Sequence, residues 1–268
     1  FEDEHKHPMN IDSMTADDLR VFADFLSSDY DISMNTIVTN MTLMRTVCNW
    51  VRKQGVTNND PFFGYDMPKA LYGTPYFLTI QERDQVLDAD LTDDAELAEY
   101  RDMFVFQCMV GCRHSDLVTF TPKNIIDGVL EYIPIKTKGK LGDVVRVPLI
   151  PKAMAILDGH DHGDDEPIFP KHYNFKFNDA IRRILKRAKV NRVVTVINPK
   201  TRLEEKKPIS DVATSHLARR TFIGNLYRMV KDPDLVASMS GHAKGSVAFA
   251  RYRVIDDDMK KSLVELIQ

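Results

Sequence analysis

Near the end of the chain, histidine, arginine and tyrosine residues recur at spacings that suit chemistry on a phosphate group. His216 and Arg219 are three residues apart, so on a helix both side chains lie on one face and can point at one small anion. A guanidinium group can donate two hydrogen bonds to phosphate oxygens, and a histidine beside it can carry a proton. Tyr252, ten residues after His242, has a hydroxyl that can attack phosphorus if nearby cations lower its pKa. This pattern predicts phosphoryl transfer.

The order of these residues resembles the C-terminal signature of the tyrosine recombinases, or phage-type integrases. That signature is His-x-x-Arg, then Gly-His, then a nucleophilic tyrosine about nine or ten residues later. His216, Arg219, Gly241, His242 and Tyr252 are in register with it. The resemblance extends over roughly the last two-thirds of the chain and more weakly over the first third.

Two further elements of the same family lie earlier in the chain. A Gly-x-Arg-x-Ser-Asp/Glu-Leu motif is matched by residues 111–117, with Arg113 as its arginine. The family also carries a lysine on a β-hairpin, and the resemblance assigns this role to Lys136. The hairpin is a few residues longer than the usual pattern, so Lys138 and Lys140 remain alternatives.

The resemblance implies site-specific recombination of duplex DNA through a covalent 3′-phosphotyrosyl intermediate, without metal, ATP or another cofactor. Arg113 and Arg219 are expected to hold the non-bridging phosphate oxygens. His216 is expected to accept the proton of the nucleophile Tyr252. Lys136 would then protonate the departing 5′ oxygen, and His242 would donate a hydrogen bond to the transition state.

Each of these residues also has an ordinary structural explanation, and only their joint order favours catalysis. Tyr227, two helical turns after Arg219, is a rival nucleophile, whereas His114 is expected to be a bystander. Arg220 is expected to contact a DNA phosphate or a core carboxylate. Two other functions stay open: a non-catalytic DNA-binding control factor on the same scaffold, and a topoisomerase of type IB.

Composition fits a globular protein that acts without a resident metal. Of the 268 residues, 43% are hydrophobic, which is enough for a substantial core. The three cysteines form no even disulfide set, and Cys108 and Cys112 lack a second ligand pair, so core positions are favoured over a zinc site. His160 and His162 flank an aspartate in a glycine-containing loop, which favours a solvated turn.

Charge is unevenly distributed along the chain. The formal net charge is −3, which argues against DNA binding on a crude test. Acidic residues are bunched near residues 2–4, 88–102 and 256–258, whereas residues 171–207 are rich in lysine and arginine. We therefore expect a basic face beside the site, with the acidic runs facing away from it.

Periodicity predicts a mainly α fold with a small antiparallel β-sheet, an α+β class. A capped helix is predicted from Thr15 and a second helix from Ser33. This region resembles the end of the family's core-binding domain, a helical module that clamps DNA. We expect that domain over residues 1–75, without its upstream helices. Residues 76–268 are expected to form the catalytic domain. Helices are predicted from Thr79 and over 95–110, a hairpin over 129–136 and 144–149, and a short strand over 193–197.

The resemblance also implies partners and a location. The expected substrate is a duplex DNA attachment site of a mobile element, passing through a Holliday junction. Four copies are expected to assemble on it through the C-terminal tail from Met259, with accessory DNA-bending proteins as possible helpers. No apolar run is long enough for a membrane span, and a cytoplasmic, nucleoid-associated protein of a bacterium or phage is expected.

Overall fold

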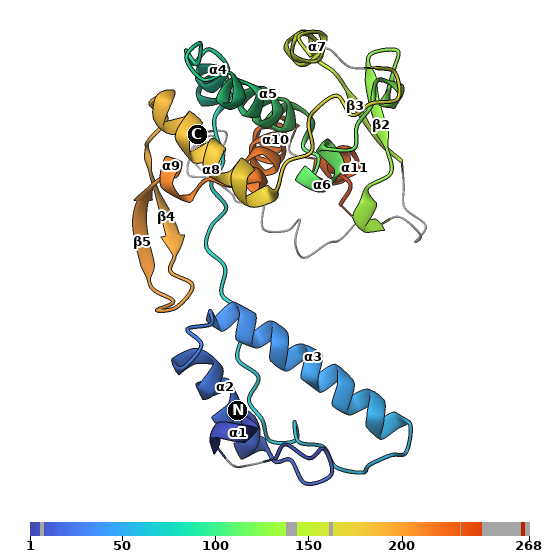
Figure 1. The fold of residues 1–268 in the computed structure, drawn as a ribbon, viewed down its shortest axis with the longest axis vertical. Helices are drawn as coiled ribbons and strands as arrows, with labels where there is room; N and C mark the ends of the chain where they lie inside the picture. The colour runs from blue at the N-terminus through green and yellow to red at the C-terminus, as the bar shows by residue number, and fades with distance from the viewer. Residues whose placement is uncertain (6–7, 138–143, 161–162, 231, 243–263, 266–268) are drawn as a thin grey trace. The chain divides into compact units, whose positions relative to one another are not determined.

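The computed structural model describes residues 1–5, 8–137, 144–160, 163–230, 232–242 and 264–265. The chain divides into two compact units, which we call the N-terminal unit (residues 1–73 with 196–205) and the C-terminal unit (residues 74–195 with 206–268). Among the described residues helices dominate both units, and the strands there form one three-stranded and one two-stranded sheet (Figure 1). The predicted α+β class is confirmed.

The N-terminal unit is built on two amphipathic helices, α2 (Ala16–Ser28) and α3 (Met34–Lys53), preceded by the short α1 (Glu2–His5). Both helices begin where the sequence predicted, because Thr15 forms a capping box with Asp18 and Ser33 accepts a hydrogen bond from the N–H of Thr36. Their apolar faces meet in a small core of Met14, Leu19, Ile37, Met41, Cys48 and Phe62.

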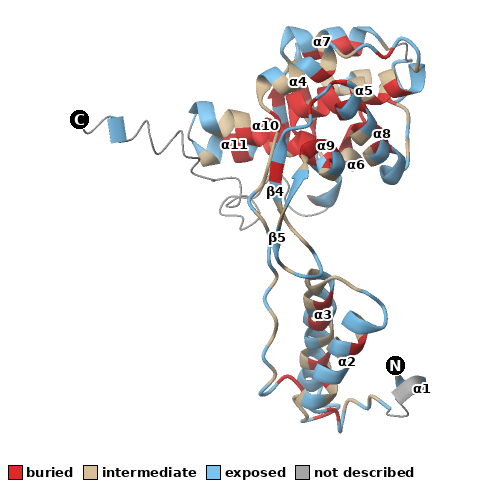
Figure 2. Ribbon diagram, turned by 90° about the vertical axis from the view of Figure 1, so that its left-hand side faces the viewer, coloured by how far each residue is buried: buried red, intermediate tan, exposed pale blue. Residues whose placement is uncertain are grey.

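The C-terminal unit is organised around α5 (Ala95–Val110), in which ten residues are buried (Figure 2). Because its neighbours pack on several sides, the second half of α5 (residues 103–110) is buried on every face instead of being amphipathic. The helices in contact with it are α4 (Ile80–Leu87), α6 (His114–Leu117), α7 (Pro151–Asp158), α8 (Asn174–Arg187) and α10 (Ser215–Val230). In the described part of this unit the other helices are α9 (Ile209–Val212) and α11 (Pro233–Ser240).

The three-stranded sheet has the order β1-β2-β3, from β1 (Ile125–Ile126), β2 (Val129–Tyr132) and β3 (Val145–Pro148). Both pairings are antiparallel, and Leu130 and Val147 face each other across β2 and β3 with buried side chains. The strand predicted to reach Lys136 ends at Tyr132, since Pro134 cannot donate to the ladder. Residues Ile135–Thr137 instead form a 3₁₀ turn, η2, and a second such turn, η1, covers Pro122–Asn124.

The two-stranded sheet joins β4 (Val193–Ile197) to β5 (Glu204–Pro208). The first strand was predicted, whereas β5 reads Glu-Glu-Lys-Lys-Pro and gives no strand signal in its sequence. Residues 196–205 belong to the N-terminal unit, where the N–H of Met34 donates to the carbonyl of Pro199 at 3.3 Å and Lys200 pairs with Asp31.

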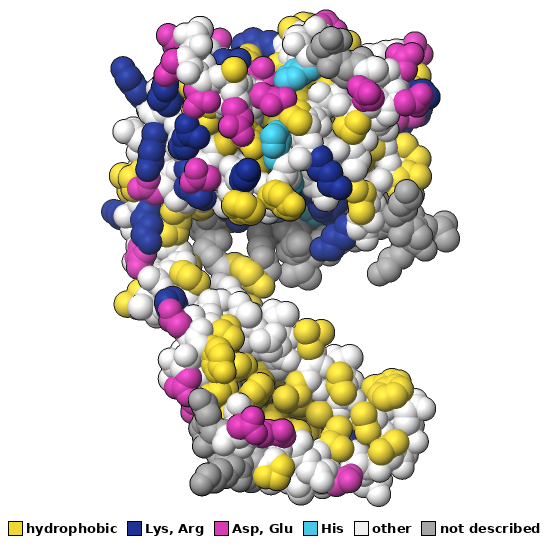
Figure 3. Space-filling model, in the orientation of Figure 1, with side chains coloured by type: hydrophobic (Ala, Val, Ile, Leu, Met, Phe, Trp, Pro, Cys, Tyr) yellow, Lys and Arg dark blue, Asp and Glu magenta, His cyan; other side chains and the backbone are white. Residues whose placement is uncertain are grey.

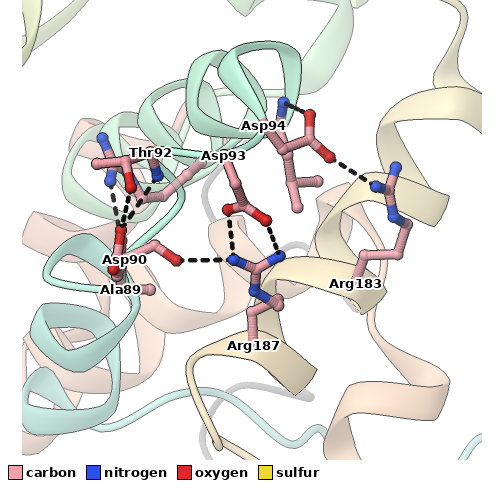
Figure 4. Close-up of polar contacts among 9 residues, drawn as sticks. Ala89, Asp90, Thr92, Asp93, Asp94, Arg183 and Arg187 are labelled. Carbon is pink, nitrogen blue, oxygen red and sulfur yellow. Dashed lines mark hydrogen bonds and ion pairs between the residues drawn. The ribbon is translucent and has the colours of Figure 1, made fainter.

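The charge distribution differs from the expected one. Arginines of α8 point at the acidic run before α5: Arg187 pairs with Asp93 at 2.6 Å and Arg183 with Asp94 at 2.8 Å (Figure 4). Lys186 pairs with Asp211 in the same way. The expectation that the acidic runs face away from the basic stretch is therefore wrong for residues 93 and 94. Much of the positive charge of α8 is neutralised within the protein.

Candidate active site

Arg113 lies at the junction between α5 and α6, where its side chain is half-buried. Gly111 ends α5 in the left-handed conformation, with φ of 69°. A Cβ atom at this position would lie 2.2 Å from Cδ1 of Phe222 on α10, so the turn has room only for glycine. The chain then passes through buried Cys112, and Arg113 becomes the N-terminal boundary residue of α6.

Helix α10 carries His216 and Arg219 one turn apart, as their spacing predicts. Arg219 is only 1% exposed, an unusual position for an arginine. Its Nη1 donates to the carbonyl oxygen of Gly111 at 2.7 Å. This bond fixes the guanidinium group against the same turn that presents Arg113.

His242 joins the same cluster from the loop after α11. That helix ends at Gly241, which again has a left-handed conformation, with φ of 64°. Nη2 of Arg219 lies 3.0 Å from Nδ1 and 3.2 Å from Nε2 of His242, and the hydroxyl of Ser240 lies 2.9 Å from Nδ1. Because arginine can only donate, a ring nitrogen of His242 must accept, which requires a neutral imidazole.

Arg113, His216 and Arg219 border a pocket of about 460 Å³ in the C-terminal unit, and His242 adjoins it through its bond to Arg219. These three side chains meet there, as their expected roles in binding phosphate and moving a proton require. The pocket is lined by Gln107, Arg113, His114, Ser115, Asn174, Ser215, His216 and Arg219. A buried Nη1 atom of Arg113 has no hydrogen-bond partner among the described residues. A buried donor without a partner is costly, so this atom is suited to a ligand oxygen.

Several pocket residues were not identified from the sequence. Oδ1 of Asn178 accepts from the backbone N–H of Ser215 at 2.8 Å, and the Ser215 hydroxyl donates to Oδ1 of Asn174 at 3.2 Å. These bonds tie the first two turns of α8 to the start of α10. His114, expected to be a bystander, lines the pocket and stacks on Phe177 with ring centroids 4.9 Å apart. No local motif marks these residues, because their contacts join distant segments.

The surroundings of two histidines favour their neutral form. Desolvation of the ring, with the positive charges of Arg220, Arg219 and Arg113, lowers the pKa of His216 to about 4, although the residue as a whole is exposed to solvent. Desolvation and the charges of Arg219 and Arg113 lower the pKa of His242 to about 3. A bound anion would oppose these shifts, because negative charge favours the protonated imidazole.

Lys136 lies on η2 with an exposed side chain. The backbone N–H of the preceding residue, Ile135, donates to Oδ1 of buried Asp116 at 2.9 Å, and Asp116 belongs to the same motif as Arg113. The alternatives Lys138 and Lys140 lie outside the described residues, and so does Tyr252. Of the tail from residue 259 onward, the structure describes residues 264 and 265 only.

The rival tyrosine, Tyr227, lies in the second half of α10 and is half-buried. Arg220 was expected to contact a DNA phosphate or a core carboxylate; in the structure its guanidinium stacks over the ring of Tyr76, 5.1 Å from the ring centroid. Tyr76 in turn donates to the carbonyl of Val212 at 2.9 Å. Arg220 therefore helps attach the start of the C-terminal unit to α10.

Nothing in the described residues suggests a metal centre: no group of three His, Cys, Asp or Glu side chains there is placed to hold an ion. Cys108 and Cys112 are buried thiols, as predicted, and burial raises their pKa values. His160, from the predicted solvated turn, lies 3.7 Å from Asp102. No described helix is long and apolar enough to cross a membrane.

Comparison with known families identifies the chain. The sequence profile of the phage integrase family matches residues 76–259, more than half of the chain. The chain belongs to the phage integrase family. It is accordingly a tyrosine recombinase, and the family suggested by the His-x-x-Arg and Gly-His motifs is confirmed. A search of curated proteins finds no match to the sequence.

Solved structures share the fold of this tyrosine recombinase. The Tn1549 transposon integrase in complex with circular intermediate DNA has a TM-score of 0.68 and 17% identity, covering 95% of this chain and 86% of that one. XerH recombinase bound to its difH substrate has a TM-score of 0.65 and 16% identity, covering 98% of this chain and 75% of that one. A lambda integrase dimer on a COC′ core site has a TM-score of 0.64 and 15% identity, covering 92% of this chain and 81% of that one.

Proposed function

We propose that this tyrosine recombinase cleaves and rejoins duplex DNA at specific sites through a covalent 3′-phosphotyrosyl intermediate, without metal or ATP. The observation that supports this most is the convergence of Arg113, His216 and Arg219 on one pocket, with His242 bonded to Arg219. Two guanidinium groups and two neutral imidazoles suit a phosphodiester, which carries one negative charge on two non-bridging oxygens.

In the proposed reaction the two arginines act as fixed donors. Arg113 has a buried Nη1 atom without a partner among the described residues, and Arg219 is held by the carbonyl of Gly111. Donors fixed before the reaction stabilise the charge that develops on the phosphoryl oxygens. Each is expected to contribute a rate factor of about 10²–10³.

The proton transfers follow from the charges around the pocket. The Tyr252 oxygen attacks phosphorus, and its proton passes to His216; the bond to the 5′ oxygen breaks, and Lys136 protonates that oxygen. With a pKa of about 4, His216 alone is a weak base. A bound phosphate would bring its negative charge close to Arg113 and Arg219 and so raise the pKa of His216 toward neutrality.

The partners are proposed on the same basis. The similar Tn1549, XerH and lambda structures each contain a DNA site, which supports duplex DNA as the substrate here. We assign DNA clamping to the N-terminal unit and strand cleavage to the C-terminal unit. Assembly of four copies through the tail from Met259, Holliday-junction formation and accessory DNA-bending proteins complete the proposal. Action on DNA in a bacterial cell is implied.

The test is to trap and map the covalent adduct. Nicked DNA carrying candidate element ends is incubated with the protein, and the modified tyrosine is found by peptide mass mapping. Tyr252→Phe should bind DNA but form no adduct, whereas Tyr227→Phe should react like the wild type. An adduct that persists in Tyr252→Phe, or maps to Tyr227, contradicts the assignment. Relaxation of supercoiled DNA that lacks any such site would point to a topoisomerase instead.

A further inference from the structure

Two aromatic side chains at the start of α8 are exposed to solvent without a role in the core. Tyr173 is 74% exposed and Phe175 is 68% exposed. Their rings stack on each other, with centroids 5.9 Å apart and an interplanar angle of 22°. Phe177, two residues further along, is fully buried under His114. The start of α8, with the residue before it, therefore has one aromatic residue that stabilises the fold and two that face outward.

The exposed pair adjoins, in sequence, a residue that lines the active-site pocket. Asn174 stands between Tyr173 and Phe175 in sequence, and it lines the pocket. Asn174 and Asn178 both form hydrogen bonds to Ser215, the residue before His216. Because these bonds join α8 to the start of α10, the aromatic pair has a fixed position relative to the catalytic histidine.

The charge around the pair differs from that on the rest of α8. Lys171 and Lys176 flank the aromatic residues, and neither forms an ion pair with any carboxylate in the described parts of the chain. In contrast, Arg183 and Arg187 further along α8 are neutralised by Asp94 and Asp93. In Figure 3, hydrophobic side chains over the start of α8 lie next to lysine or arginine and histidine. This surface combines apolar contact area with uncompensated positive charge, as nucleic-acid-binding surfaces do.

We propose that Tyr173 and Phe175 contact the base pairs beside the phosphate in the pocket and give the enzyme its sequence preference at those positions. The inference rests on the proposed function. A phosphate of duplex DNA cannot enter the pocket alone, because the next nucleotide of its strand follows after about 3.4 Å of helix rise. Residues at the pocket edge therefore face neighbouring nucleotides. Lysines can bind the phosphates of the DNA backbone, while aromatic rings can contact thymine methyl groups or the faces of bases.

A photo-crosslinking experiment tests which macromolecule the pair contacts. The variant Phe175→p-benzoylphenylalanine is irradiated with a labelled pool of randomised DNA duplexes, and Ile150→p-benzoylphenylalanine serves as the control. Ile150 is exposed but does not line the pocket. Efficient crosslinking to DNA from position 175 alone supports the proposal. Crosslinking between two copies of the chain, or equal yields from both positions, overturns it.

A selection experiment then tests the role in specificity. Wild type, the double variant Tyr173→Ala/Phe175→Ala and Ile150→Ala each select binding sites from the same pool. The double variant should lose base preference next to the cleavage position and bind the wild-type consensus about tenfold more weakly, the scale of one lost base contact. An unchanged consensus and affinity would overturn the inference.

The two proposals fail in different ways. If the wild type forms the Tyr252 adduct on its selected DNA while the double variant keeps the same preference, the recombinase mechanism stands and the aromatic contact is wrong. If the double variant loses preference but the wild type forms no adduct on any selected site, the contact stands and the cleavage mechanism is wrong.

Discussion

Asp116 and Ile135 connect two motifs that lie nineteen residues apart in sequence. Oδ1 of the buried Asp116 carboxylate accepts the backbone N–H of Ile135 at 2.9 Å, directly before Lys136. The helix that follows Arg113 thereby anchors the turn that carries the proposed general acid. A buried carboxylate in this position is better explained by holding a backbone group than by chemistry of its own.

We therefore expect Asp116→Ala to impair cleavage through loss of the Lys136 position. DNA with a 5′-bridging sulfur needs no proton to expel its leaving group, so it should restore cleavage by both Lys136→Ala and Asp116→Ala. Asp116→Asn keeps an acceptor oxygen and should retain more activity on ordinary DNA. Cleavage rates on the two substrates provide the measurement. A defect in Asp116→Ala that sulfur does not relieve would show a general loss of structure.

The sulfur-containing substrate also decides between the three lysines. Lys136→Ala should regain cleavage on this DNA, whereas Lys138→Ala and Lys140→Ala should cleave ordinary DNA nearly as well as the wild type. The reason is that only the general acid becomes dispensable when the leaving group needs no proton. If the sulfur-containing DNA restores cleavage by Lys138→Ala or Lys140→Ala instead, that lysine is the general acid and Lys136 is not.

The two arginines should respond differently to the same substitution. Arg113→Lys removes a fork that can span two phosphate oxygens, so single-turnover cleavage should fall about 10²–10³ fold, or about 3–4 kcal/mol. Its Tm should stay close to that of the wild type. Arg219→Lys also breaks the bonds to Gly111 and His242, so both cleavage and Tm should fall. Near wild-type cleavage by either variant would refute the role of that arginine in binding phosphate.

Gly111 offers a test of how the turn before Arg113 is built. Gly111→Ala would place a methyl group 2.2 Å from Phe222 and force an alanine into the left-handed conformation. We expect the free energy of unfolding to fall by roughly 2–6 kcal/mol in total. Gly128→Ala is the matched control, because Gly128 also has a positive φ of 75° but nothing within 4 Å of the added atom. Equal losses in urea denaturation would mean that contact with Phe222 contributes nothing.

Acidification should destabilise the DNA-free protein. The folded-state pKa values of His216 and His242, about 4 and about 3, lie below the ordinary value of 6.5. Between these values the unfolded chain binds protons that the folded chain does not, so the free energy of unfolding falls as the pH drops from 6.5 toward 4. Tm measured from about pH 7 to about pH 5 should fall less in His242→Gln than in the wild type. Identical slopes for the two proteins would contradict the neutral state of His242.

Features of the fold and of the site could be predicted from the sequence where the interacting residues are close together along the chain. The helix starts at Thr15, Ser33 and Thr79 were predictable, because a capping side chain and the backbone groups it bonds are only three residues apart. The positions of His216 and Arg219 on one helix face followed from helical periodicity, and their order along the chain indicated the family.

Contacts between distant segments were decided only by the tertiary structure. The sequence shows an acidic run and a basic run, but not that Asp93 meets Arg187 or Asp94 meets Arg183. Likewise, no local pattern links Asn178 to Ser215 or Asp116 to Ile135. The pairs made by α8 form because packing of α5 and α10 against α8 brings their segments together, and that packing depends on the combined shape of many apolar side chains rather than on any short motif.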